Sequence, residues 1–130
     1  MTTESLCRLA PVFDRGCLTA GNSSGVNDGT AALLLVSQAA VDRYGLTPLA
    51  RVVGAATAGL APRIMGIGPI EATRRLLSRT GVALGDVDFV ELNEAFATQV
   101  LLVQRALGLL DDAEHVNPKG GALHSATRWG

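Results

Sequence analysis

Three short apolar runs alternate along this chain with stretches in which apolar residues recur at helical spacing. The apolar runs are residues 30–36, 49–58 and 87–92. Runs of this length are typical of buried strands, and strands that alternate with helices indicate an α/β fold in which helices cover a sheet. We therefore predict three strands at these positions, each followed by a helix.

The predicted helices carry recognisable start and stop signals. They cover residues 37–45, 69–81 and 94–107. Ser37 is a natural N-cap, Pro69 suits a first helical turn, and glycine ends the first two helices. In the third helix, four apolar residues at intervals of four, three and four predict one buried face: Phe96, Val100, Val103 and Leu107.

Composition excludes several classes of protein. The chain has 130 residues, about one domain, and its 48% hydrophobic content excludes intrinsic disorder. A net charge of -1 offers no basic surface for nucleic acid, and no apolar run is long enough for a membrane span. The amino terminus has no signal-peptide pattern. We therefore predict a soluble, cytoplasmic protein that binds neither nucleic acid nor membrane.

The two cysteines give no sign of a metal site. Cys7 and Cys17 lie ten residues apart, with no CxxC pair and no histidine cluster. A disulfide between them stays open, although free thiols are favoured in a reducing cytosol.

Polar residues end the third apolar run, at the point where the chain turns into a helix. Asn93 could cap that helix and Glu94 could add negative charge to its first turn, which is a purely structural interpretation. Ligands of α/β proteins usually bind where strands end, so the Asn93 amide could instead face a substrate. Spacing alone favours the structural interpretation.

A loop rich in Gly and Ser, residues 19–29, precedes the first apolar run. Its glycines would let a ligand approach the backbone, but it matches neither the P-loop nor the GxGxxG pattern. It is weak evidence of binding by itself.

Three motifs together resemble the thiolase family, which contains acetyl-CoA acetyltransferases and 3-ketoacyl-CoA thiolases. They are TAGNSSG with NDG at residues 19–29, MGIGP at residues 65–69 and NEAFA at residues 93–97. The resemblance runs from about Glu4 to Ala122. It implies part of a layered α-β-α-β-α sandwich of mixed sheets packed with helices. By this resemblance residues 1–45 finish the amino-terminal half and residues 46–124 form part of the carboxyl-terminal half, while residues 125–130 match nothing in the family.

The resemblance also implies roles for individual residues. Thiolases transfer an acyl group from coenzyme A through a cysteine thiolate, with a histidine, a second cysteine and an oxyanion hole. Asn93 resembles the oxyanion-hole asparagine, which acts through a held water. Ser24 resembles a residue of the pantetheine-binding loop, and Met65, Ala95 and Phe96 resemble the wall of the acyl and pantetheine tunnel. Coenzyme A is a substrate in this chemistry, so no metal and no further cofactor are expected.

The chain departs from the family pattern at its other catalytic positions. Neither cysteine lies in the nucleophile motif, and the late catalytic cysteine is missing. The GGAxxxGHP motif begins at residues 120–122, but Thr127 stands where the histidine should be. His124 lies three residues early, as a candidate base or as a terminal histidine without a role.

These departures leave three functional hypotheses. The leading one is a truncated thiolase-type acyltransferase, for acyl-CoA thiolysis or Claisen condensation, that is incomplete on its own. The alternative is a noncatalytic module that binds acyl-CoA or CoA and pairs with another thiolase chain. The third is a degenerate fragment without function. Thiolases are commonly homo-oligomers, so the resemblance implies a homo-oligomer or a pairing with another thiolase chain.

Overall fold

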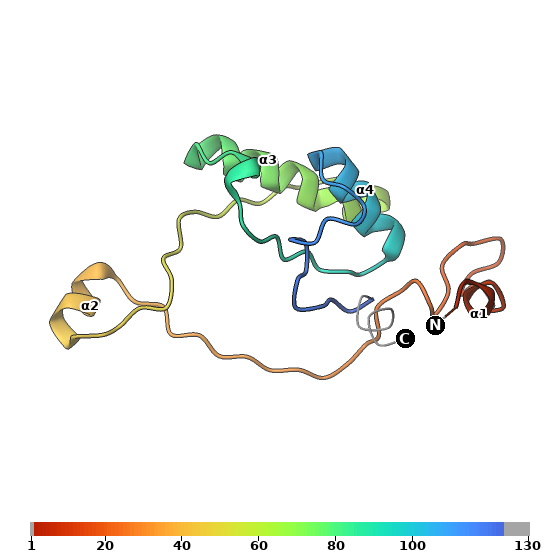
Figure 1. Cartoon of the computed structure of the whole chain (residues 1–130), viewed down its shortest axis with the longest axis horizontal. Helices are drawn as coiled ribbons and strands as arrows, with labels where there is room; N and C mark the ends of the chain where they lie inside the picture. The colour runs from red at the N-terminus through yellow and green to blue at the C-terminus, as the bar shows by residue number, and fades with distance from the viewer. Residues whose placement is uncertain (1, 124–130) are drawn as a thin grey trace.

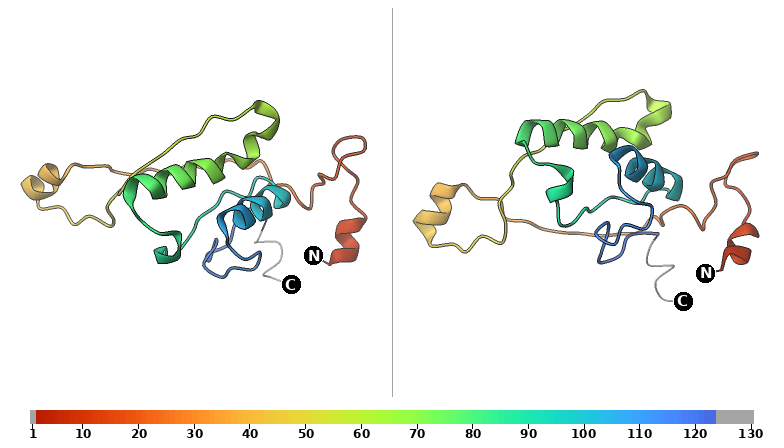
Figure 2. Two further views of the ribbon diagram at one scale, coloured as in Figure 1. Left: turned by 90° about the horizontal axis from the view of Figure 1, so that it is seen from above. Right: turned by 45° about the horizontal axis from the view of Figure 1, so that its top comes forward.

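Two helices and a short 3-10 segment pack together and form the compact part of the molecule (Figure 1). The structure is a computed structural model that describes residues 2–123. Its elements are α1 (Thr3–Cys7), α2 (Gln38–Tyr44), η1 (Pro62–Ile67), α3 (Gly68–Thr80), η2 (Leu84–Asp86) and α4 (Ala97–Leu107). Contacts join α3, α4 and η1, whereas α1 and α2 lie apart from them in each view (Figures 1 and 2).

The small core lies between α3 and α4. Val103 is fully buried at 1% exposure, and Ile70 of α3 is also buried. A buried side chain of this size contributes about 1.5–3 kcal/mol. The guanidinium of Arg74 donates to the carbonyl oxygen of Ala106 at 2.9 Å and so ties α3 to the last turn of α4. These contacts hold α3 and α4 together.

Side-chain hydrogen bonds from Gln104 and Arg105 stabilise the carboxyl end of α4. The Arg105 guanidinium donates to both carboxylate oxygens of Asp111, at 2.8 and 2.6 Å. These hydrogen bonds hold the pKa of the Asp111 carboxyl below its ordinary value. The buried Gln104 donates to the carbonyl oxygen of Leu110 at 3.1 Å, which fixes the same turn.

Two of the three predicted helices form where the sequence places them. Ser37 caps α2 by accepting from the N–H of Ala40, and Gly45 ends that helix at φ 60°. Helix α3 begins at Gly68 and is followed by Gly81 at φ 71°. No helix among the described residues is long and apolar enough to cross a membrane.

The third helix begins later than predicted. Helix α4 starts at Ala97 rather than Glu94, and its N-cap residue is Phe96, with no side-chain capping bond. The prediction that Asn93 caps the helix is therefore wrong. The residues just before Ala97 are not helical, because hydrogen bonds to other segments hold their backbone.

None of the three predicted strands forms within residues 2–123. Residues 30–36 and 49–58 are extended without a ladder, and bridging is limited to two isolated pairs, Ser23 with Phe96 and Val90 with Val116. A strand needs a neighbour for its backbone N–H and C=O groups, and residues 30–36 meet none among the residues that the structure describes. Leu33 is 90% exposed, so this apolar run is not buried as predicted.

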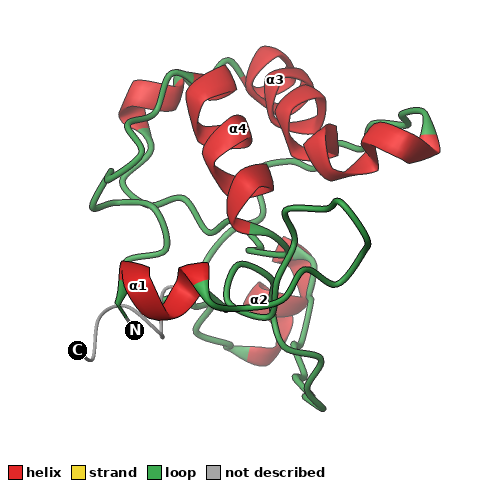
Figure 3. Cartoon of the chain, turned by 90° about the vertical axis from the view of Figure 1, so that its right-hand side faces the viewer, coloured by secondary structure: helices red, strands yellow, loops and turns green. Residues whose placement is uncertain are grey.

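The second extended segment runs along α3 (Figure 2), and Figure 3 draws the connections between the helices as loops rather than strands. The guanidinium of Arg75 donates to the carbonyl oxygen of Thr57 at 3.2 Å. A side chain at Gly54 would press on Thr80 and Leu76, so this glycine permits the close approach.

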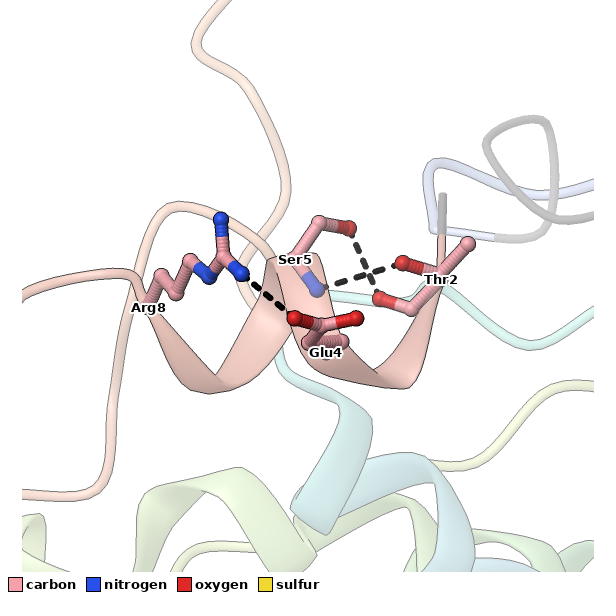
Figure 4. A network of polar contacts seen from close by, with 4 residues as sticks. All are labelled: Thr2, Glu4, Ser5 and Arg8. Atoms are coloured by element: carbon pink, nitrogen blue, oxygen red, sulfur yellow. Dashed lines mark hydrogen bonds and ion pairs between the residues drawn. The ribbon is translucent and has the colours of Figure 1, made fainter.

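The amino-terminal helix is held by its own side chains (Figure 4). The N–H of Ser5 donates to the Thr2 hydroxyl at 3.2 Å, and the Ser5 hydroxyl donates to the Thr2 carbonyl at 2.7 Å. Glu4 and Arg8 form an exposed ion pair one turn apart. Cys7, in the same helix, is an exposed free thiol, as is Cys17, so no disulfide joins them.

Candidate functional site

Segments from three parts of the chain meet just before α4. The N–H of Ser24 donates to the carbonyl of Ala95 at 3.0 Å, and the N–H of Ala97 donates to the carbonyl of Asn22 at 3.0 Å. These two bonds form the antiparallel bridge between Ser23 and Phe96. The Gly/Ser loop and the NEAFA motif, which are far apart in the sequence, are therefore direct neighbours.

Asn117 joins a third segment, residues 117–123, to the place where the Gly/Ser loop meets the NEAFA motif. We call this place the corner. Asn117 is 3% exposed, and its side-chain oxygen accepts from the N–H of Leu92 at 2.7 Å. Its amide nitrogen donates to the carbonyl of Leu92 and to Glu94 Oε1, both at 2.9 Å. The backbone N–H of Asn117 donates to the carbonyl of Val90 at 2.8 Å. One asparagine thus holds residues 90–94 along their length.

The carboxylate of Glu94 is buried in the same place. Glu94 is 7% exposed, and its Oε2 accepts from the N–H of Leu123 at 2.5 Å. A side chain at Gly121 would overlap this carboxyl group, so only glycine fits there. Glu94 was predicted to add charge to the first turn of a helix. That prediction is wrong, because the residue precedes α4 and binds the 117–123 segment instead.

The predicted site residues fall into two groups. Asn93, Ala95 and Phe96 lie on the segment before α4 that these hydrogen bonds hold, and the backbone N–H of Ser24 donates to it. Along this extended segment Leu92 is half-buried, Asn93 exposed and Glu94 buried, because successive side chains of an extended chain point to opposite faces. The Asn93 side chain therefore belongs to the solvent-facing side of the corner.

Met65 lies on a neighbouring element. It belongs to η1, is 75% exposed, and is followed by Gly66, which packs near the Gln99 side chain of α4. This contact places η1 against the first turns of α4, next to the corner. His124 lies outside the described residues, so its predicted role as a base stays a prediction.

Side-chain hydrogen bonds of Asn22 stabilise the first turn of the Gly/Ser loop. The side-chain oxygen of Asn22 accepts from the N–H of Thr19 at 2.8 Å, and its amide donates to the carbonyl of Cys17 at 2.8 Å. Asn22 therefore fixes the loop immediately before the residues that bridge to α4.

The sequence interpretation missed Asn117 and Gly121. A signal was available, because Asn followed by Pro marks a turn, and Asn tolerates the positive φ of 48° that residue 117 adopts. What the sequence did not show is the partner, since Leu92 lies far from Asn117 along the chain.

The corner does not resemble a metal site. Within residues 2–123 no group of three or more His, Cys, Asp or Glu side chains could hold a metal ion. An open cavity of about 460 Å³ lies elsewhere, between α3, the last turns of α4 and residues 59–60. It includes none of the predicted site residues.

Comparison with known proteins identifies the class of protein to which this corner belongs. Residues 46–126 match the thiolase C-terminal domain, and residues 1–39 match the thiolase N-terminal domain. The chain belongs to the thiolase family.

Individual relatives are similar over almost the whole chain. A β-ketoadipyl-CoA thiolase of Pseudomonas putida is 58% identical, and an acetyl-CoA acetyltransferase of Shinella zoogloeoides is 50% identical. Each match covers 94% of this chain and 31% of the relative. The chain therefore spans about a third of the length of the curated relatives it matches.

Solved structures confirm the predicted fold class. Human mitochondrial 3-ketoacyl-CoA thiolase in complex with CoA is 48% identical, with a TM-score of 0.88 over 95% of this chain and 31% of that one. The Bacillus anthracis acetyl-CoA acetyltransferase is 47% identical, with a TM-score of 0.87. The chain is thus part of the layered α/β thiolase fold.

Proposed function

We propose that this chain supplies the acyl-CoA-binding corner of a thiolase-type acyltransferase, for thiolysis or Claisen condensation of acyl-CoA. The observation that supports this most is the pair of backbone hydrogen bonds that holds Ser24 beside Ala95. It joins the loop expected to bind pantetheine to the segment expected to carry the oxyanion hole. A structure of a similar human thiolase contains CoA.

Each residue of the corner has a distinct role in this proposal. The Asn93 amide, exposed beside the clamped backbone, would hold the water that stabilises the thioester oxyanion. Phe96, Ala95 and Met65 would line the acyl and pantetheine path. CoA enters as substrate, so the proposal requires no resident cofactor.

We further propose that the chain is catalytically incomplete on its own. Both cysteines are free and exposed. An oxyanion hole lowers the barrier only when a nucleophile attacks beside it.

Binding of CoA to the chain tests the proposal directly. We expect calorimetry to detect CoA binding and Ser24→Asp to weaken it about tenfold, because the new carboxylate repels the anionic ligand close to its path. Ser78→Asp, on the exposed face of α3, is the matched control and should leave the Kd unchanged. An equal Kd for Ser24→Asp and the unaltered chain would contradict the assigned role of the loop.

Thiolysis of acetoacetyl-CoA tests incompleteness. We expect no turnover above the enzyme-free rate, since neither cysteine lies in the nucleophile motif of the family. Robust turnover by the chain would disprove incompleteness. Turnover that persists in a Cys7→Ser, Cys17→Ser double variant would also exclude the cysteine mechanism.

A second function is favoured by the exposed apolar segments. Leu33, Leu34 and Leu49 are at least four-fifths exposed on extended backbone whose hydrogen-bonding groups could pair with strands. The chain would then be a noncatalytic acyl-CoA-binding module that pairs with another thiolase chain. Native mass spectrometry with and without such a chain, combined with a thiolysis assay of the complex, distinguishes the two functions. A stable complex without thiolysis would support the noncatalytic module and not the acyltransferase.

A further inference from the structure

We infer that Glu94 is a positioning residue that fixes the orientation of Asn93 toward the acyl group. The inference rests on the proposed function of the corner and deepens it, because it names the residue on which the oxyanion element depends. Glu94 itself is buried and would touch neither CoA nor the thioester.

The carboxylate binds two groups on the same segment. Oε1 accepts from the side chain of Asn117 at 2.9 Å and Oε2 accepts from the N–H of Leu123 at 2.5 Å. Gly121 lies against the carboxyl group, with no room for a side chain between them. Glu94 therefore joins the NEAFA segment to both ends of the 117–123 segment.

These contacts restrict the residue next to it. Backbone bonds hold Leu92 on one side of Asn93, through Asn117, and Ala95 on the other side, through Ser24. Between these two held residues, the side chain of Glu94 is itself anchored to Asn117 and Leu123. On an extended segment, anchoring one side chain inward directs its neighbour outward. The direction of the Asn93 amide is thus set by the anchor at Glu94.

A carboxylate suits this position better than an amide does. Asn117 and Leu123 each offer an N–H donor, and a carboxylate presents two acceptor oxygens. A glutamine would have to turn its own NH2 group toward one of those donors. Glu94→Gln should therefore release one partner while it keeps the volume of the side chain.

The experiment compares two probes, CoA and acetyl-CoA, on the 130-residue chain. The ratio of their Kd values isolates the acyl group, because the pantetheine and nucleotide parts are shared. We expect Glu94→Gln to reduce the preference for acetyl-CoA about threefold to tenfold, the range of one lost hydrogen bond, and to leave the Kd for CoA unchanged. Asn93→Ala should reduce the same ratio, and Glu94→Gln should add nothing in an Asn93→Ala background. Glu91→Gln, an exposed carboxyl on the same segment, is the matched control.

The outcomes separate this inference from the proposed function. If Asn93→Ala lowers the ratio and Glu94→Gln does not, or if the two effects simply add, the inference is overturned and the proposed function stands. If neither probe binds, or if Asn93→Ala leaves the ratio unchanged, the proposed function fails and takes the inference with it. Glu94→Asp, whose shorter side chain withdraws from Leu123, provides a second test with the same expected loss. Unfolding of both variants, seen by circular dichroism, would also overturn the inference, because Glu94 would then hold the whole fold.

Discussion

Replacing Asn117 by Ala should lower the free energy of unfolding by about 2–4 kcal/mol, because it removes all the hydrogen bonds of a buried side chain. The Leu92 N–H and carbonyl and one oxygen of Glu94 all lose the side chain that binds them. Alanine is also less tolerant than asparagine of the φ of 48° at this position. The loss should therefore exceed that of an ordinary surface substitution several-fold.

Urea denaturation followed by circular dichroism measures this effect. Asn27→Ala is the control, since Asn27 is exposed, and it should shift the free energy by no more than about 0.5 kcal/mol. If Asn117→Ala proves as mild as the control, Asn117 does not hold the three segments together.

A methyl group at position 121 should also be costly. Gly121→Ala places Cβ within the space of the Glu94 carboxyl group, so the carboxylate must move away from Leu123 or the 117–123 segment must shift. Overpacking of this kind costs about 1–3 kcal/mol, and the displaced hydrogen bond adds to it. We expect a total loss of about 2–4 kcal/mol.

Gly59→Ala provides the comparison, because a Cβ at Gly59 would meet nothing within 4 Å. In a Glu94→Ala background, Gly121→Ala should lose most of its cost, since the group it collides with is gone. Equal costs of Gly121→Ala in both backgrounds would show that the collision with Glu94 is not the cause.

Local signals in the sequence predicted the helices well. Ser37, Gly45 and Gly81 act through contacts within one turn, so they specify helix ends without knowledge of the rest of the fold. The predicted start of α4 was wrong because Asn117 and the 22–24 loop, both distant in sequence, bind the backbone of residues 92–97 and keep the residues before Ala97 out of the helix.

The predicted strands do not form, because a strand depends on partners that a local sequence pattern does not identify. The apolar run at residues 30–36 has the pattern of a buried strand, but burial requires partners that these residues do not meet within the part of the chain that the structure describes. Asn93, Ala95, Phe96 and Ser24 could be selected by motif, and the structure brings them together. Glu94 could not be assigned by its position alone, because its role depends on Gly121 and Leu123.

The bridge between Ser23 and Phe96 has a consequence for how the chain folds. It closes a loop of more than half the chain with only two backbone hydrogen bonds, so most of the closure entropy must be met by other contacts. Helices α3 and α4 are near neighbours in sequence and can associate first, whereas the corner must wait for this distant pairing. We therefore expect the amides of Ser24 and Ala97 to exchange with solvent faster than those in the middle of α3, which makes the proposed binding corner later to close and earlier to open than the α3–α4 pair.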